Sequence, residues 1–195
     1  MVDGGSTDET CAIADAAGTR LIRTKLGRGT QLRAGAAAAR GDWLLFLHAD
    51  TVLEPGWAEE AEAFMERVAK GRRAPAAAAF RFALDDDGMM PRMLESLVAL
   101  RCFLLALPYG DQGLLIPRRL YGELGGFRPI PLMEDVDLVR RLKRRQLVML
   151  QSRAVTSGIA LSRAKAMSRA RLRNLCCMLL YFLRVPTRVL ARLYG

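Results

Sequence analysis

The apolar run at residues 43–47 constrains the fold of this 195-residue chain most strongly. Continuous apolar runs of this length are typical of strands that are covered on both faces of a sheet. The run follows a glycine turn at Gly41, and it is succeeded by His48, Ala49 and Asp50. We therefore expect a central strand that places an aspartate at its carboxyl end.

Helix-like and strand-like segments alternate along residues 1–157. Ser6 and Glu9 fit a capping box at the start of the first helix. The expected helices are at about 6–17, 30–40, 57–69, 91–107, 118–124 and 134–145, and the expected strands at about 19–24, 43–47, 76–84, 114–117 and 147–150. This alternation predicts an α/β fold with a mostly parallel sheet that is flanked by helices on both faces.

The charge of the chain is concentrated at its carboxyl end. All 20 acidic residues lie at or before Asp137, whereas 14 of the 30 basic residues follow it. We expect a basic helical tail at residues 158–195, interrupted by Pro186 and separate from a domain at 1–157. Such a tail favours an anionic partner. Its uncharged stretch, residues 174–183, is too short to span a bilayer.

Three partners for this tail stay open. It can lie on an anionic membrane surface as an interfacial helix. It can pack on the sheet or on a second copy of the chain. Nucleic acid ranks below these two, because the chain contains no RNA- or DNA-binding motif.

The cysteines and the amino terminus bear on location. The four cysteines show no paired CxxC spacing, which favours reduced, buried thiols over a disulfide framework or a zinc site. No basic stretch followed by an apolar run comes after Met1, so the sequence shows no secretory signal. We expect a cytoplasmic protein, at the inner face of the membrane if the tail binds lipid.

The first of three acidic sites is the glycine turn at residues 2–8. It leads into a helix amino terminus, whose free amides could face a ligand. Asp3 could hold the ribose or base of a nucleotide, with Gly4 and Ser6 beside it. A tight turn with a helix cap is the structural alternative.

The second and third sites follow a strand and open a helix. Asp50 is a candidate ligand for Mg²⁺ or Mn²⁺, which take oxygen ligands and often only one or two protein carboxylates. Its alternative role is to cap the following turn. Glu134 and Asp135 begin a helix, where acids also complement the helix dipole. A carboxylate at such a corner can reach a substrate proton, and Asp135 is the candidate general base.

Two further groups are candidates for substrate contact. Arg28 and Arg33 flank the turn and helix ahead of the apolar run, and they could pair with a diphosphate. Solvated helix charges are the equal alternative. The polar loop at residues 109–113 lies between apolar segments, and Asp111 is its candidate for substrate contact.

Five motifs occur in the order and spacing of a known family. They are VDGGSTDET (2–10), LLFLHADT (44–51), GDQGLL (110–115), GGF (125–127) and MEDVDLVRRL (133–142). Over residues 2 to about 157 the chain resembles a bacterial group of family-2 glycosyltransferases with the GT-A fold. The resemblance implies that a sugar moves from a nucleotide diphosphate sugar to an acceptor hydroxyl with the help of Mg²⁺ or Mn²⁺.

The resemblance also implies residue roles. Asp3 would contact the nucleoside, Asp50 would bind the metal, and Asp135 beside Glu134 would deprotonate the acceptor in an inverting displacement. The acceptor side is implied for Tyr109, Asp111 and Gln112.

The chain departs from the family pattern in three places. The DxD-type motif reads His48-Ala49-Asp50, and Thr156-Ser157 lacks the usual arginine-rich, tryptophan-containing continuation. Family members also begin with a strand and an Asn-Glu loop ahead of the Asp3 motif, so we expect the first strand to be missing. The alternative function is therefore a catalytically impaired remnant or subunit that acts in membrane or partner association. Missing that strand, the sheet would expose edges that favour a homo-oligomer.

Overall fold

The fold is seen in a computed structural model that describes residues 1–86, 88–156, 177, 180, 181 and 183–194. The chain divides into two compact units. Unit 1 contains residues 1–40, 125–138 and 168–195, and unit 2 contains residues 41–124 and 139–167. The predicted boundary after residue 157 adjoins residues outside the described part of the chain, and it stays a prediction.

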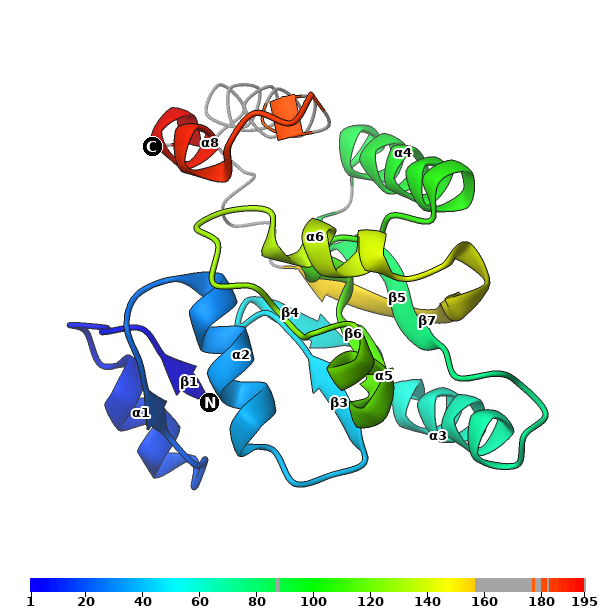
Figure 1. Cartoon of the computed structure of the whole chain (residues 1–195), viewed down its shortest axis with the longest axis horizontal. Helices are drawn as coiled ribbons and strands as arrows, with labels where there is room; N and C mark the ends of the chain where they lie inside the picture. The colour runs from blue at the N-terminus through cyan, green and yellow to red at the C-terminus, as the bar shows by residue number, and fades with distance from the viewer. Residues whose placement is uncertain (87, 157–176, 178–179, 182, 195) are drawn as a thin grey trace. The chain divides into compact units, whose positions relative to one another are not determined.

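Unit 2 is built on a five-stranded sheet with the order β3-β6-β5-β7-β4 (Figure 1). The α/β class is confirmed, but the strand directions differ from the prediction, because β6 returns between β3 and β5 and is antiparallel to both. Among the described strand pairs of this sheet, only β5 with β7 is parallel, and β4 is antiparallel to β7. The strands are β3 (Trp43–Phe46), β4 (Thr51–Leu53), β5 (Ala77–Leu84), β6 (Leu114–Pro117) and β7 (Leu147–Thr156).

The central strand of this sheet is β5, not β3 as the apolar run suggested. Among the described strands β3 is at the edge of the sheet, and Leu45 is 37% exposed. In β5, Ala77, Ala78, Ala79 and Phe80 are all fully buried. Alanine side chains are small, so helices can pack closely on both faces of this strand.

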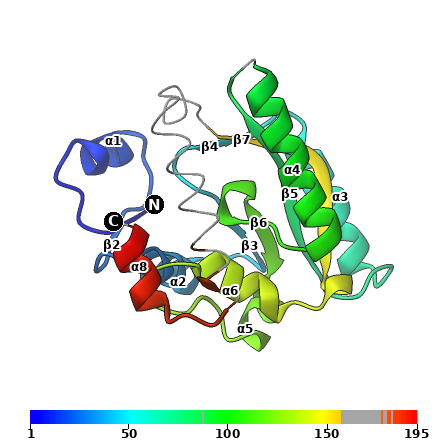
Figure 2. The same ribbon diagram turned by 90° about the horizontal axis from the view of Figure 1, so that it is seen from above.

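Two helices cover β5 from opposite sides, α3 (Trp57–Ala69) and α4 (Met89–Leu105) (Figure 2). On the α3 side, Phe64 is fully buried in the main apolar cluster, and the Trp57 and Phe80 rings pack edge to face with centroids 6.2 Å apart. On the α4 side, Glu95 accepts a hydrogen bond from the Leu84 amide at 2.9 Å. These contacts fix both helices to the strand.

The pairing of β5 with β7 contains a register shift between Ala79 and Arg81. A shift of this kind leaves backbone amides without ladder partners. The Glu60 carboxylate of α3 accepts hydrogen bonds from the Gln151 amide at 2.7 Å and the Ser152 amide at 2.8 Å. One side chain therefore satisfies the irregular part of β7 and ties it to α3.

Two short helices and two 3-10 turns complete unit 2 and its junctions. Gly110 begins the turn η1 (Gly110–Gln112), which precedes β6. The others are α5 (Arg118–Glu123) after β6, and η2 (Arg144–Gln146) before β7. The predicted helix at 134–145 ends earlier, as α6 (Glu134–Arg141).

Unit 1 contains a two-stranded parallel ladder, β1 (Val2–Asp3) with β2 (Ile22–Arg23). Its helices α1 (Thr10–Ala16) and α2 (Arg28–Ala38) follow these strands. The predicted capping box is wrong. The first helix begins at Thr10. The Ser6 hydroxyl donates a hydrogen bond to the Asp3 carboxylate at 2.6 Å and does not cap the helix.

The basic tail is described only in part. Its last helix, α8 (Thr187–Tyr194), begins after Pro186 as predicted. The rest of the predicted tail helices lies mostly outside the described residues. Within the described part of the chain, no helix is long and apolar enough to cross a membrane.

Candidate functional site

In unit 1, the Asp3 carboxylate organises the turn that follows β1. It accepts hydrogen bonds from the Gly5 amide at 2.9 Å, the Ser6 amide at 3.1 Å and the Ser6 hydroxyl at 2.6 Å. These hydrogen bonds lower the pKa of Asp3 from its ordinary value of 3.8 to about 2. The bond from the Ser6 hydroxyl has the largest effect, and the bonds from the Gly5 and Ser6 amides have smaller ones. Asp3 is therefore a buried, ionised anchor for the turn.

The turn itself presents Gly4 and Ser6. A side chain at position 4 would approach the Gln31 side chain to 3.0 Å, so glycine keeps this part of the turn close to α2. Gln31 also donates to the Val2 carbonyl at 3.3 Å. Sequence reasoning missed Gln31, whose position on α2 becomes meaningful only when β1 and α2 are packed. The nucleoside contact of Asp3, Gly4 and Ser6 stays a prediction, while the turn geometry that would support it is present.

The start of α2 packs against the loop that leads to α6. Gly29 is buried there, and a Cβ at this position would lie 2.3 Å from the Arg128 carbonyl oxygen. Only glycine allows this approach. The contact brings the Arg28 side chain to the Glu134 carboxylate, with Nε 3.1 Å from Oε1. The structure thus pairs Arg28, predicted to meet a diphosphate, with an acid of the protein.

Glu134 is 1% exposed, and its neighbour Asp135 is half-buried. Burial raises the pKa of Glu134, the negative charge of Asp135 raises it further, and Arg28 opposes both effects. Met133, just before the pair, has a φ of 64° in the left-handed region, which is uncommon outside glycine. A fixed turn, a glycine contact and an ion pair together hold the candidate base Asp135 at the start of α6.

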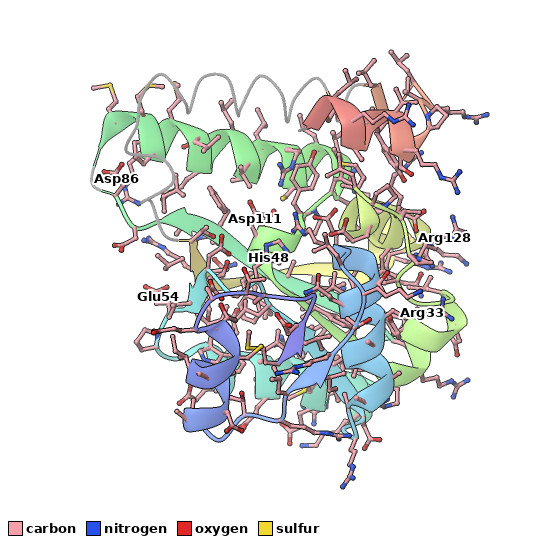
Figure 3. The ribbon with its side chains drawn as sticks, turned by 90° about the vertical axis from the view of Figure 1, so that its left-hand side faces the viewer. Arg33, His48, Glu54, Asp86, Asp111 and Arg128 are labelled. Atoms are coloured by element: carbon pink, nitrogen blue, oxygen red, sulfur yellow. The ribbon has the colours of Figure 1, made fainter. Side chains whose placement is uncertain are left out.

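The second candidate arginine of α2 behaves differently. Arg33 is exposed on the helix (Figure 3), and no hydrogen bond or ion pair engages it within the described chain. Both predicted roles of Arg33, diphosphate contact and solvated charge, stay open.

In unit 2, Asp50 and the predicted acceptor loop emerge at the same end of the sheet. Phe46, the last residue of β3, pairs with Leu114, the first residue of β6. Asp50 follows the end of β3, and Asp111 precedes the start of β6 (Figure 3 labels His48 and Asp111 in this region). Sequence reasoning expected the ligand to bind at this end of the strands.

The loop at this edge is held by Gln112, which is 1% exposed. Its amide nitrogen donates to the Phe80 carbonyl at 3.0 Å, and its amide oxygen accepts from Arg101 at 3.0 Å and from the Tyr109 amide at 3.3 Å. The Arg101 guanidinium also lies over the Tyr109 ring, 3.6 Å from its centroid. Gln112 therefore holds the loop from within, and Asp111 and Tyr109 are its remaining candidates for acceptor contact.

Sequence reasoning missed Arg101, which is half-buried and donates to the Leu107 carbonyl at 3.0 Å. Sequence reasoning assigned it no role within the helix expected at about 91–107. Only the packing of α4 beside the loop shows its role as the partner of Gln112 and Tyr109.

Asp50 fits a metal that arrives with a substrate. The residue is exposed, and its carboxylate accepts one long hydrogen bond, 3.4 Å from the Thr51 hydroxyl. Among the described residues, no group of three His, Cys, Asp or Glu side chains could hold a metal ion. A Mg²⁺ or Mn²⁺ ion bound here would take most of its ligands from phosphate and water, which is common for these hard cations.

Known structures share this architecture. A crystal structure of glucosyl-3-phosphoglycerate synthase from Mycobacterium tuberculosis with phosphoglyceric acid superposes with a TM-score of 0.57 at 20% identity, over 89% of this chain and 66% of that one. The chain has the GT-A glycosyltransferase fold. The same synthase with Mn²⁺ and UDP-glucose, and with Mg²⁺ and UDP, gives a TM-score of 0.56 at 19% identity in each case, over 89% of this chain and 65% of that one.

Sequence comparison agrees with the GT-A fold over the first part of the chain. Residues 1–74 match the family model for Glycosyl transferase family 2, a region that contains Asp3 and Asp50. No curated protein matches the chain by sequence. The chain spans slightly less than two thirds of the synthase, 66% of its length. The predicted absence of a first strand stays a prediction.

Proposed function

We propose that the chain is a metal-dependent glycosyltransferase that moves a sugar from a nucleoside diphosphate sugar to an acceptor hydroxyl. The observation that carries the proposal is the exposed Asp50 at the sheet edge of a GT-A fold, inside the region that matches the family-2 model. Structures of similar fold hold Mn²⁺ with UDP-glucose, which supports a nucleotide sugar as the donor class.

The proposed roles give each candidate side chain one task. Asp50 would hold the metal ion, which supplies positive charge to stabilise the departing diphosphate. The turn built on Asp3 would bind the nucleoside, and the exposed Arg33 is better placed than the engaged Arg28 to meet a phosphate. Asp111 and Tyr109 would contact the acceptor.

The proposed reaction is a single displacement. The Asp135 carboxylate takes the proton of the acceptor hydroxyl, and the acceptor oxygen forms a bond to the anomeric carbon. The bond from that carbon to the diphosphate oxygen breaks, and its electron pair leaves with the nucleoside diphosphate. Inversion at the anomeric carbon follows from this one-step path. The buried Glu134 would hold Asp135 in place and would not take the proton.

Phosphoglyceric acid and glycerol 3-phosphate accompany the mycobacterial synthase in its structures. For this chain we propose an acceptor hydroxyl without naming the molecule. A cytoplasmic location, binding of the basic tail to anionic membrane and a homo-oligomer all stay predictions.

Calorimetric titration of UDP and of GDP, each with and without Mn²⁺, tests the proposal. If the chain is a transferase, at least one of the two nucleotides should bind, and Mn²⁺ should strengthen its binding. A folded sample that binds neither nucleotide would favour the alternative, an impaired remnant or subunit.

A further inference from the structure

Helix α4 carries an apolar stripe on the face that points away from the sheet. Met89 is 88% exposed, and Phe103, at the other end of the helix, is 73% exposed. Between these two residues, exposed apolar side chains recur every three or four positions, so they lie on one face of the helix. The stripe consists of Met89, Met90, Met93, Leu97, Leu100, Phe103 and Leu104.

The opposite face of α4 is the one that packs on unit 2. Val98 and Cys102 are buried there, roughly half a turn away from Leu100. The stripe is therefore additional to the core-facing surface of the helix. Contiguous exposed apolar patches on a protein surface often mark an interaction site.

The two ends of the stripe differ in charge, because the exposed Asp85 and Asp86 precede its amino end and bases cluster at its carboxyl end. Glu95 is the only acid of α4, and its carboxylate is engaged by Arg92 at 2.8 Å and by the Leu84 amide at 2.9 Å. At the carboxyl end of the helix, Arg144 donates to the Leu104 carbonyl at 2.7 Å and also to the Phe103 carbonyl. Lys143 and Arg145 flank Arg144 and are exposed.

A pocket joins the apolar and basic parts at this end of α4. No acidic side chain of the described chain lines it. Its apolar walls and basic rim include Leu105, Leu107, Leu142, Arg140, Lys143 and Arg144. An apolar surface bordered by bases matches a ligand with hydrocarbon next to negative charge.

We propose that the α4 stripe and the basic turn at residues 143–145 dock unit 2 onto an anionic lipid bilayer. The stripe would enter the boundary between headgroups and acyl chains, and Lys143 and Arg145 would meet lipid phosphates. A protein partner would need acids beside an apolar groove, whereas a bilayer supplies negative charge and hydrocarbon as one continuous surface. This surface is distinct from the carboxyl-terminal tail, and it does not depend on the proposed transferase function.

Vesicle sedimentation of the full chain tests the proposal. Vesicles of phosphatidylcholine and phosphatidylglycerol in equal amounts are compared with vesicles of phosphatidylcholine alone. Leu97→Ser with Leu100→Ser, and separately Lys143→Glu with Arg145→Glu, should each weaken binding to the anionic vesicles about tenfold or more. Leu26→Ser and Arg72→Glu remove an exposed leucine and an exposed arginine elsewhere and should bind as the unaltered chain does.

A second readout follows the stripe itself. Phe103→Trp should gain fluorescence that brominated lipids quench, above the background of Trp43 and Trp57. Circular dichroism shows whether each variant is folded. Binding that survives the α4 and 143–145 substitutions would overturn the proposal and assign lipid binding to another part of the chain. Loss of a dimer with no change in vesicle binding would overturn it in favour of a second copy of the chain.

Discussion

The Arg28 guanidinium lies 3.1 Å from the buried Glu134 carboxylate and joins the start of α2 to the start of α6. The pair is unequal, because the Arg28 side chain is 49% exposed and that of Glu134 is 1% exposed. Solvent weakens the interaction on the arginine side, whereas loss of the arginine leaves a buried acid with less compensation. The ion pair thus connects two segments that are far apart in sequence, next to the candidate base.

Replacing Arg28 with alanine should lower the free energy of unfolding by about 1–2 kcal/mol, a value between those of exposed and buried pairs. Urea denaturation measures this difference. In a Glu134→Gln background the same replacement should cost less than about 0.5 kcal/mol, because the buried charge is gone. Arg33→Ala, on the exposed side of the same helix, is the matched control. Equal losses in both backgrounds would show that Arg28 acts through packing alone.

The pH dependence of stability should carry the signature of Glu134. Its folded-state pKa is raised above the ordinary 4.5, first by burial. The stability that the protonated acid contributes is therefore fully present below 4.5 and is lost as pH rises through the raised value. As the pH rises above 4.5, the unaltered chain should lose stability relative to Glu134→Gln. The opposite slope in urea denaturation would mean that Arg28 outweighs the burial of the acid.

Gly29→Ala should destabilise unit 1 by about 2 kcal/mol, because the new methyl group meets the Arg128 carbonyl oxygen. Thermal unfolding measures the change. Gly122→Ala is the matched control, since nothing lies within 4 Å of the added methyl group, and it should stabilise the chain by about 0.5 kcal/mol. Similar effects at the two positions would show that α2 does not approach the loop as closely as the structure indicates.

Gln112→Ala should cost about 2–3 kcal/mol, because the Phe80 carbonyl and the Tyr109 amide lose a buried partner. Hydrogen exchange of the Tyr109 amide should also increase, since its hydrogen bond to the side chain is gone. Gln151→Ala, at an exposed position, should stay within about 0.5 kcal/mol of the unaltered chain. A small effect at Gln112 would contradict a positioning role.

Local patterns predicted the elements of unit 2 well where one segment decides its own structure. Apolar and acidic residues at helical spacing predicted α3 at its observed bounds, and the apolar residues before Arg118 predicted β6. The three-residue strand β4 carried no periodic signal of its own, because it forms by pairing with the end of β7. Strand directions were missed for a related reason. Long-range pairing, and not the local sequence, places β6 between β3 and β5 and antiparallel to both.

The candidate site divides in the same way. A carboxylate after an apolar strand can be recognised from sequence, and Asp50 is exposed at the sheet edge as expected. The interaction partner of a side chain is harder to recognise from sequence. Arg28 and Gln112 were candidates for substrate contact, and long-range packing gives them partners inside the protein that the sequence did not indicate. Their contact with a substrate stays a prediction.

The most direct measurement is calorimetric titration of UDP and GDP in the presence of Mn²⁺ for three chains, the unaltered one, Asp50→Asn and Asp86→Asn. Asp86 is an exposed acid in the turn after β5, with no assigned role, and serves as the matched control. We expect the unaltered chain and Asp86→Asn to bind a nucleotide equally and to lose affinity when Mn²⁺ is chelated. Asp50→Asn should bind about tenfold more weakly or worse with Mn²⁺, and its affinity should no longer depend on the metal. Equal metal-dependent binding by Asp50→Asn, or no binding by a folded unaltered chain, would contradict a nucleotide-sugar transferase that holds its metal through Asp50.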